Sequence, residues 1–293
     1  MGIQIVLYQS ILLTTLPDTC YHFSQIKLKK PIEKEYIMNG FIVMTRGRTG
    51  STAIIDELDQ LSSILAGQEL FTNVPYKAWG SHALTQDYKS MEPFEYWLGE
   101  DRPMRLLQRR LLGDKHLISK YLKFAERNTL AANKSAFGFK VISHHLTENN
   151  PLIKVLSKRN YSIIYLTRNL SRQIVSGLLA RQRGVYNRKN FQDTGRYLVD
   201  VDEFVSLVKW EQSAVNADRE FIKDNGFRSF DITYEDFVAD RTIFYTGLLG
   251  FLNVPFELPE KSSYSVMIND LEHSIINYDE VKGAADNIGM PIV

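Results

Sequence analysis

Residues 40–52 read Gly-Phe-Ile-Val-Met-Thr-Arg-Gly-Arg-Thr-Gly-Ser-Thr, and this stretch decides the predicted fold. The four apolar residues 41–44 predict a strand that is buried on both faces of a parallel sheet. A loop with two glycines follows, and apolar residues then recur at helical spacing over 54–61. A strand, a glycine-bearing loop and a helix in this order predict the first half of a βαβ unit.

Outward from this unit, short apolar runs predict further strands at 136–142, 162–166 and 229–232. Helical periodicity follows the strand that ends at Leu166, and residues 241–251 predict another helix. We therefore expect an α/β protein with a P-loop NTPase-like three-layer fold, a mainly parallel central sheet and helical insertions.

One insertion, residues 92–128, is charged, rich in helical pattern and interrupted by Pro103. Its basic residues, interleaved with Leu107, Leu111 and Leu112, predict the solvated face of an amphipathic helix. At the other end of the chain, residues 1–37 predict an N-terminal extension, so the main domain is expected over 38–293.

Composition limits the partners of the protein. The 293 residues carry a net charge of +1, which gives no overall field for nucleic acid, so a bound anion needs a local cluster. The single Cys20 excludes an intramolecular disulfide and a multi-cysteine metal site. Residues 3–16 lack the cationic start of a signal peptide, and no apolar run is long enough to span a membrane. We expect a soluble, cytoplasmic protein, and the sequence leaves a homodimer open.

The anion loop, residues 45–50, carries the strongest chemical signal. A helix that begins here offers backbone amides without intrahelical partners and the positive end of its dipole. Gly47 and Gly50 let the backbone approach phosphate oxygens, Ser51 and Thr52 add hydroxyls, and Arg48 adds a cation. The plainer alternative is a strand-to-helix turn with Ser51 as the N-cap.

A nucleoside-triphosphate P-loop is a second alternative, and it needs Gly-Lys-Ser/Thr at the start of the helix. Here Ser51 stands between Gly50 and Thr52, so the loop lacks the lysine that reaches the terminal phosphates. A P-loop-type nucleotide kinase and a non-catalytic protein that binds adenine nucleotides remain open as alternatives.

The segment Arg48-Thr49-Gly50-Ser51-Thr52 resembles the 5′-phosphosulfate loop of sulfotransferases that use 3′-phosphoadenosine 5′-phosphosulfate (PAPS). That loop has a basic residue followed by Ser/Thr-Gly-Ser/Thr-Thr. The similarity is closest to the bacterial branch that includes glycolipid (trehalose-type) and oligosaccharide sulfotransferases. It implies PAPS as co-substrate, no metal, and a small-molecule or glycan acceptor, with a carbohydrate or glycolipid as the first expectation.

Two further segments extend the resemblance over residues 40–255. The family binds the 3′-phosphate with an Arg at a strand end and a Ser eight positions later, which here are Arg168 and Ser176. Phosphate binding by Arg168 is also expected without the resemblance, because a guanidinium can hold a phosphate in bidentate fashion. The segment 233–237 is similar to one whose Tyr lies beside the adenine, which makes Tyr234 a predicted nucleotide contact.

The proton-accepting base has two predicted locations. The bacterial relatives use a glutamate soon after the first helix, and the resemblance of residues 66–71 implies Glu69; a glutamate is ionised at neutral pH and can take a proton. His144 and His145 compete, because residues at the carboxyl end of a strand face the crevice where α/β sheets bind ligands. Arg48 is expected to stabilise the charge on the leaving nucleotide. No Cys or carboxylate stands at ligand spacing from the histidines, so zinc is not expected.

Overall fold

The computed structural model describes residues 38–72, 91–99, 103–184, 195–264 and 270–292. The predicted N-terminal extension, residues 1–37, lies outside the described residues and stays a prediction. The elements of the described residues are, in chain order, β1 (Asn39–Thr45), α1 (Ser51–Gln60), β2 (Ile64–Glu69), α3 (Phe94–Leu98), α4 (Pro103–Ala131), β3 (Ala136–Ile142), α5 (Ser143–Thr147), α6 (Asn150–Lys158), β4 (Ser162–Thr167), α7 (Leu170–Arg183), α8 (Val201–Asp224), β5 (Ser229–Thr233), α9 (Tyr234–Ala239), α10 (Arg241–Leu252), α11 (Leu271–Ser274) and α12 (Tyr278–Asn287).

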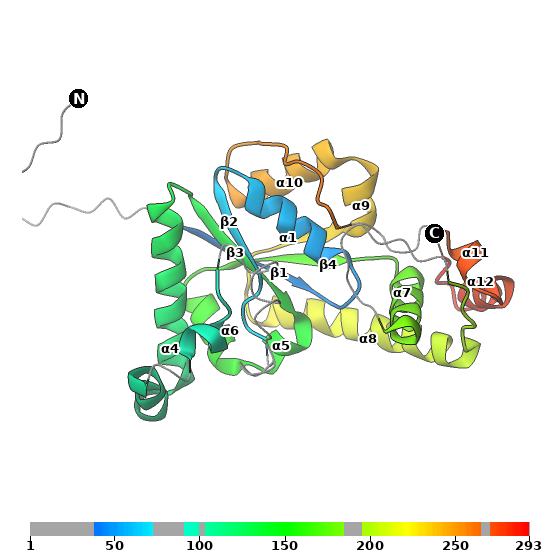
Figure 1. Cartoon of the computed structure of the whole chain (residues 1–293), viewed down its shortest axis with the longest axis horizontal. Coiled ribbons are helices and arrows are strands. Elements are labelled where there is room, and N and C mark those ends of the chain that lie inside the picture. The colour runs from blue at the N-terminus through cyan, green and yellow to red at the C-terminus, as the bar shows by residue number, and fades with distance from the viewer. Residues whose placement is uncertain (1–37, 73–90, 100–102, 185–194, 265–269, 293) are drawn as a thin grey trace, which may run out of the picture. The chain divides into compact units, whose positions relative to one another are not determined.

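The described strands form one parallel sheet in the order β2-β3-β1-β4-β5 (Figure 1). β1 is central, and its side chains alternate between two cores. Ile42 and Met44 pack in the core that also contains residues of α4 and α6, whereas Phe41 and Val43 pack in the core with α1 and α10. This burial on both faces explains the unbroken apolar run and confirms the predicted α/β, P-loop NTPase-like three-layer fold.

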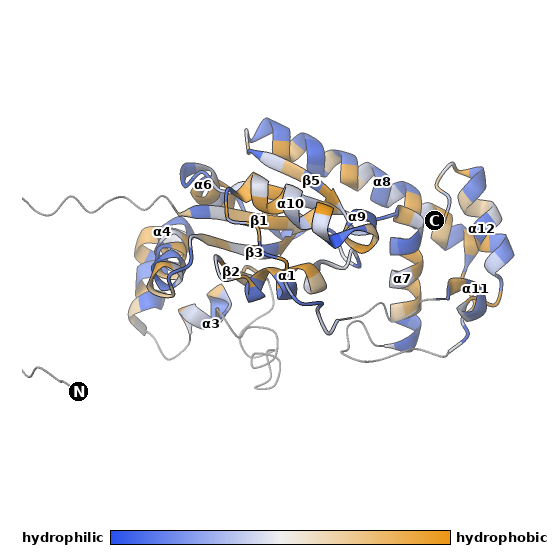
Figure 2. Cartoon of the chain, turned by 90° about the horizontal axis from the view of Figure 1, so that it is seen from above, coloured by the Kyte–Doolittle hydropathy of each residue, from blue (hydrophilic) through white to orange (hydrophobic). Residues whose placement is uncertain are grey.

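Helices cover both faces of the sheet. In Figure 1, α1, α9 and α10 lie on one face, and α5, α6 and α8 lie on the other. Figure 2 shows apolar stripes beside polar ones on these helices, as expected of helices that cover a sheet. A third apolar cluster joins α7, the first half of α8 and α12. None of the described helices combines the length and the apolar character that crossing a bilayer requires.

The predicted strands at 136–142, 162–166 and 229–232 are β3, β4 and β5, and the predicted helix 241–251 is α10. β2 was not predicted as a strand. Among the described strands it pairs only with β3, its register shifts between Gly67 and Glu69, and its second half is polar. An edge strand of this kind lacks the unbroken run of apolar residues that predicts a strand from the sequence. Glu69 therefore ends a strand of the sheet.

The insertion differs from its prediction in two ways. Pro103 begins α4 instead of interrupting a helix, as its fixed φ and missing N–H allow at a first helical position. Within α4 the residue that breaks helical geometry is Gly113, at φ 76° and ψ 169°. The predicted helix is present, but its three leucines do not form a buried face, because Leu107, Leu111 and Leu112 are 48%, 71% and 56% exposed. The buried face of α4 lies in its second half and consists of Leu117, Ile118, Tyr121, Leu122 and Ala125.

A buried carboxylate fixes α1 to the C-terminal part of the domain. Glu57 accepts hydrogen bonds from Arg241 Nη2 at 2.7 Å, from the Tyr245 hydroxyl at 2.9 Å and from the Ser262 amide at 2.8 Å. Its side chain is 3% exposed. Burial, and then the Glu57 carboxylate, raises the pKa of Tyr245. One charge therefore holds α1, α10 and the following segment together.

We predict that Glu57→Ala lowers the free energy of unfolding by about 3–5 kcal/mol, the cost of removing one partner of a buried ion pair. The matched control is Asp231→Ala, whose ion pair with Arg219 is about half exposed on both sides and should contribute less than about 1 kcal/mol. Urea unfolding measures both changes. Equal effects of the two substitutions would contradict the anchoring role of Glu57.

Candidate functional site

The predicted residues gather at one edge of the sheet, where the carboxyl ends of the parallel strands meet. Glu69 ends β2, His144 and His145 follow β3, Arg168 follows β4 and Tyr234 follows β5. The anion loop follows the central strand β1 and so lies in the middle of this row. The sheet order therefore brings to one edge residues that are far apart in the chain, such as Gly50 and Tyr234.

The anion loop has the backbone geometry that exposes a helix start. Gly50 is the N-cap of α1 at φ 81°, and no side chain caps the helix, so the alternative of Ser51 as the N-cap is wrong. Arg48 also has a positive φ, 68°, which is uncommon for a residue other than glycine. Two left-handed residues turn the chain into α1, whose first amides have no partners within the helix.

Thr49 shapes the loop from inside. Its side chain is buried, and its hydroxyl donates to the Arg46 carbonyl oxygen at 3.2 Å and contacts the Thr45 hydroxyl. Thr45 in turn donates to the carbonyl oxygen of Leu166 on β4. The contribution of Thr49 to ligand binding can therefore come from its backbone, whereas its side chain holds the turn against the sheet.

Tyr234 lies directly on the anion loop. A Cβ atom at Gly50 would stand 2.3 Å from Cδ2 and from Cε2 of the Tyr234 ring, so only glycine fits there. On the same ring, the guanidinium carbon of Arg168 lies 4.6 Å from the centroid, within cation–π range. Burial raises the pKa of Tyr234, and the Arg168 charge opposes that rise. The ring thus joins the loop to the predicted phosphate-binding arginine.

Arg168 is a partly buried cation beside the anion loop. Its Nη1 donates to the Arg48 carbonyl oxygen at 3.1 Å, but its buried Nε has no hydrogen-bond partner, and it forms no ion pair among the described residues. Burial lowers the pKa of the Arg168 guanidinium. Arg48 extends from the loop to α7, where Nε and Nη2 each lie 3.4 Å from the Ser176 hydroxyl. Arg48 thus contacts Arg168 through its carbonyl oxygen and Ser176 through its guanidinium, and an anion bound beside Arg168 would stabilise the Arg168 charge.

A lysine from the neighbouring strand stands at the start of α1. Lys140 on β3 is buried, its Nζ lies 2.9 Å from Glu69 Oε1, and it donates to Thr52 Oγ1 at 3.4 Å. Gln68 also donates to the Thr52 carbonyl oxygen, at 3.3 Å. β3 therefore brings a lysine to the first turn of α1, and Lys140 connects Glu69 to Thr52 of that turn.

The two histidines sit on α5, with ring centroids 4.2 Å apart. His144 is exposed, whereas the buried Nδ1 of His145 has no hydrogen-bond partner among the described residues. Burial and the neighbouring His144 lower the pKa of His145, against the opposing effects of Glu69 and Glu148. His145 is therefore neutral at pH 7, the form that accepts a proton. In the part of the chain that the structure describes, no three His, Cys, Asp or Glu side chains are grouped as a metal ion requires.

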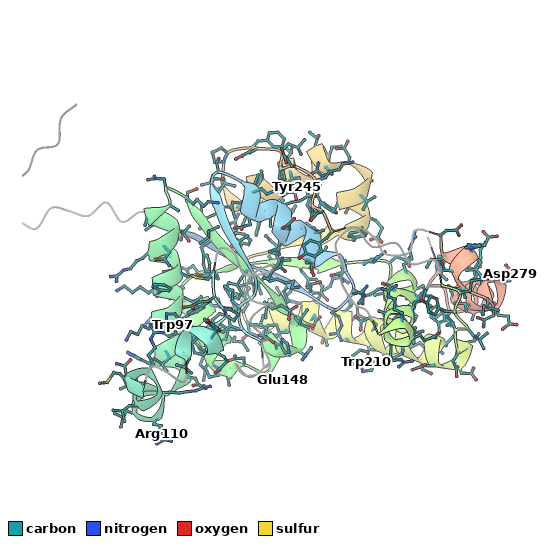
Figure 3. All side chains as sticks on the ribbon, viewed as in Figure 1. Trp97, Arg110, Glu148, Trp210, Tyr245 and Asp279 are labelled. Atoms are coloured by element: carbon teal, nitrogen blue, oxygen red, sulfur yellow. The ribbon has the colours of Figure 1, made fainter. Side chains whose placement is uncertain are left out.

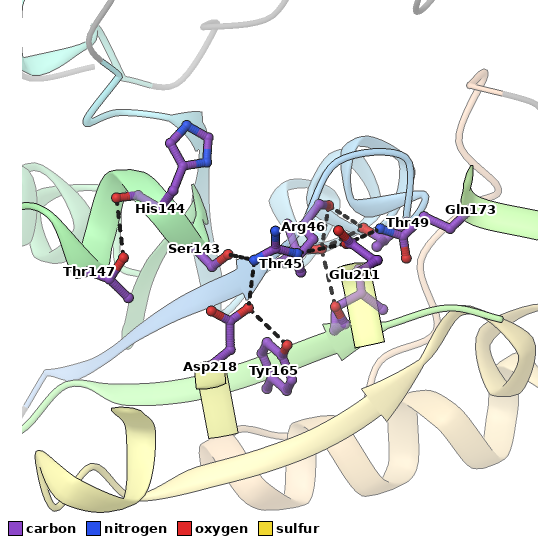
Figure 4. Close-up of polar contacts among 11 residues, drawn as sticks. Thr45, Arg46, Thr49, Ser143, His144, Thr147, Tyr165, Gln173, Glu211 and Asp218 are labelled. Carbon is purple, nitrogen blue, oxygen red and sulfur yellow. Dashed lines mark hydrogen bonds and ion pairs between the residues drawn. The ribbon is translucent and has the colours of Figure 1, made fainter. Parts of the chain in front are cut away.

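Sequence reasoning missed a buried ionic network behind the loop (Figure 4). Arg46 Nε donates to Glu211 Oε1 at 2.7 Å, and its Nη1 lies 3.4 Å from Asp218 Oδ2 and 3.1 Å from the Ser143 hydroxyl. The Glu211 and Asp218 side chains are 5% and 6% exposed. Burial lowers the pKa of Arg46, but the two carboxylates outweigh it and raise that pKa above its usual value.

The same two carboxylates bind the neighbouring elements. Glu211 accepts from Gln173 Nε2 on α7 at 2.7 Å, and Asp218 accepts from the Tyr165 hydroxyl on β4 at 3.0 Å. A signal for this network exists in the sequence, because both acids occupy the apolar stripe of α8. The buried residues of that stripe are Phe204, Val208, Glu211, Val215, Asp218 and Ile222. Acids at such positions indicate a buried partner.

No family model matches the chain, and no curated protein matches it. Solved structures do. The sulfotransferase domain from the curacin biosynthetic pathway is 16% identical, with 87% of this chain and 99% of that chain covered and a TM-score of 0.44. A sulfotransferase from Alicyclobacillus acidocaldarius is 13% identical, with 86% and 93% covered and a TM-score of 0.40. The sulfotransferase domain from the Synechococcus PCC 7002 olefin synthase is 14% identical, with 87% and 97% covered and a TM-score of 0.43. At these identities and scores, the function of this chain has to follow from its own site.

We predict that Gly50→Ala lowers the free energy of unfolding by about 1–3 kcal/mol, because alanine is strained at a positive φ and its methyl group meets Tyr234. Gly47→Ala is the control, since a Cβ there meets no atom within 4 Å, and it should leave stability nearly unchanged. Chemical denaturation of both variants measures the difference. A Gly50→Ala protein as stable as the control would show that the ring does not rest on the loop.

Proposed function

We propose that this protein is a sulfotransferase that moves the sulfuryl group of PAPS to a hydroxyl of a small-molecule or glycan acceptor. The observation that carries the proposal is that Arg48 of the anion loop contacts both Arg168 and Ser176, and that Arg168 forms no ion pair among the described residues. A nucleotide with anionic groups at both ends fits an uncapped helix start beside a second, separate cation.

Contacts of the predicted residues support a position for the donor. The loop amides, Arg48, Ser51 and Thr52 hold the 5′-phosphosulfate, and Arg168 and Ser176 hold the 3′-phosphate. Tyr234 contacts both Gly50 and Arg168, which supports its predicted place beside the nucleoside. The donor therefore spans the β1, β4 and β5 ends of the row and leaves the β2 and β3 ends to the acceptor.

The acceptor oxygen attacks the sulfur atom, the bond between sulfur and the bridging oxygen breaks, and 3′,5′-adenosine diphosphate leaves. Arg48 and Lys140 stabilise the negative charge that develops on the departing group and on the sulfuryl oxygens. The hydroxyl proton goes to the cluster of Glu69, His144 and His145, with Glu69 as the proposed base. A carbohydrate or glycolipid is the proposed acceptor, since residues 66–71 resemble the bacterial branch.

We predict that the protein binds 3′,5′-adenosine diphosphate more tightly than ATP, with or without magnesium. Arg168→Ala should weaken that binding by about 1.5–3 kcal/mol, the range for a hydrogen bond to a charged group. Arg219→Ala, an exposed arginine on α8, should change nothing. Titration calorimetry measures these affinities. Tighter binding of magnesium-ATP would favour a nucleotide kinase, and unchanged affinity in Arg168→Ala would refute its role.

We also predict that Glu69→Gln lowers the transfer of labelled sulfate from PAPS into a panel of glycans and alcohols by about 10²–10⁴-fold, the usual contribution of a general base. The amide can keep its contact with Lys140, so the affinity for 3′,5′-adenosine diphosphate should stay unchanged. His144→Asn and His145→Asn, measured in parallel, should retain more activity. Normal turnover in Glu69→Gln would move the base to the histidines, whereas binding without transfer in the wild type would indicate a non-catalytic nucleotide-binding protein.

A further inference from the structure

A cavity of about 420 Å³ opens beside the anion loop, between α5, α7 and α8. Gly47, Arg48 and His144 form its end at the loop. Its walls are mainly apolar and are made by Ile142, Ile174, Leu178 and Leu207, with Trp210 beside them. Its volume lies within the range of sites for small molecules, about 300–1,000 Å³.

Trp210 is 60% exposed, although tryptophan is on average a largely buried residue. Figure 3 labels Trp210 on α8, close to α7. An indole that remains in water beside an apolar cavity leaves a surface whose burial by a ligand would be favourable. Trp210 lines the same cavity as Gly47 and Arg48, so this exposed indole lies near the proposed transfer site.

The Trp210 ring has a cationic partner. The guanidinium carbon of Arg46 lies 5.0 Å from the ring centroid, and Arg46 is itself fixed by Glu211 and Asp218. Trp210 directly precedes Glu211 on α8. The ring and the carboxylate that positions Arg46 therefore come from adjacent residues of one helix. A side chain that is already ordered loses less entropy when a ligand stacks on it.

We propose that Trp210 is the platform on which the ring of the acceptor stacks, and that the acceptor is a ring-bearing alcohol with an apolar face. The inference rests on the proposed function and names the substrate class of that site. Trp210 lines the same cavity as Arg48 and His144, so a ring seated on Trp210 lies in the cavity that reaches the proposed transfer site. A pyranose and a phenol both have an apolar face with a hydroxyl at the ring edge.

The experiment measures ring binding to the full chain saturated with 3′,5′-adenosine diphosphate, which mimics the spent donor and permits no reaction. Trehalose is the pyranose probe and 2-naphthol is the phenol probe. We expect at least one of them to bind, and Trp210→Ala to weaken that probe about tenfold while Trp210→Phe keeps most of the affinity. The probe that binds identifies the source of the ring.

Phe256→Ala is the matched control, since Phe256 is a similarly exposed aromatic residue, 54% exposed, that does not line the cavity. It should leave ring binding unchanged. The inference is overturned if neither probe binds, or if Trp210→Ala binds as the wild type does. It is also overturned if Trp210→Ala changes only the molar mass in solution, which would make the surface a contact between copies of the chain.

The affinity of each variant for 3′,5′-adenosine diphosphate separates this inference from the proposed function. Trp210→Ala should leave it unchanged, because Trp210 has no place in the donor site. If the wild type fails to bind this nucleotide, the proposed function fails. Normal binding of the nucleotide without Trp210-dependent binding of a ring would overturn the platform alone.

Discussion

The ion pair of Arg46 with Glu211 and Asp218 is the interaction on which the rest of the site depends. Arg46 stands one residue beyond β1, and its side chain is 14% exposed. A cation so placed is costly unless carboxylates compensate it, and both carboxylates come from α8, about 170 positions later in the chain. Through Glu211 and Asp218 the same charge cluster also reaches α7 and β4. The anion loop is thus fixed from behind to the elements that carry its predicted partners.

Two other cations at this edge of the sheet, Lys140 and Arg168, differ in whether a carboxylate pairs with them. Lys140 and Glu69 compensate each other at 2.9 Å, so this pair is satisfied without a ligand. Arg168 forms no ion pair with a described carboxylate, and burial disfavours its charge more than the nearby Tyr234 and Glu235 favour it. A folded protein keeps such an arrangement at a cost in stability, which a bound anion would offset. The contrast between a satisfied pair and an unsatisfied cation is the physical reason to place the donor's phosphate at Arg168.

Much of the fold could be predicted from periodicity, because strands and helices that are buried on a full face leave a strong apolar pattern. β1, β3, β4 and α10 are of this kind. β2 could not be recognised, since it is an edge strand whose second half is polar. Leu107, Leu111 and Leu112 of α4 were predicted to form an apolar face, but the structure leaves them exposed. Apolar spacing shows that a helix has an apolar face, but not that the protein covers that face, and Leu111 is 71% exposed.

By itself the sequence determined the anion loop, since a glycine-bearing turn between a buried strand and a helix is a local feature with local physics. It also suggested Glu69, Arg168, Ser176 and Tyr234 as separate sites. Only the tertiary structure decided that these residues lie along one edge of the sheet, because that placement depends on the strand order and on parallel pairing. The ion-pair partners of Arg46 and the exposure of Trp210 were likewise decided by the packing of α8. Sequence distance carries no information about such contacts, whereas the common edge of a parallel sheet creates them.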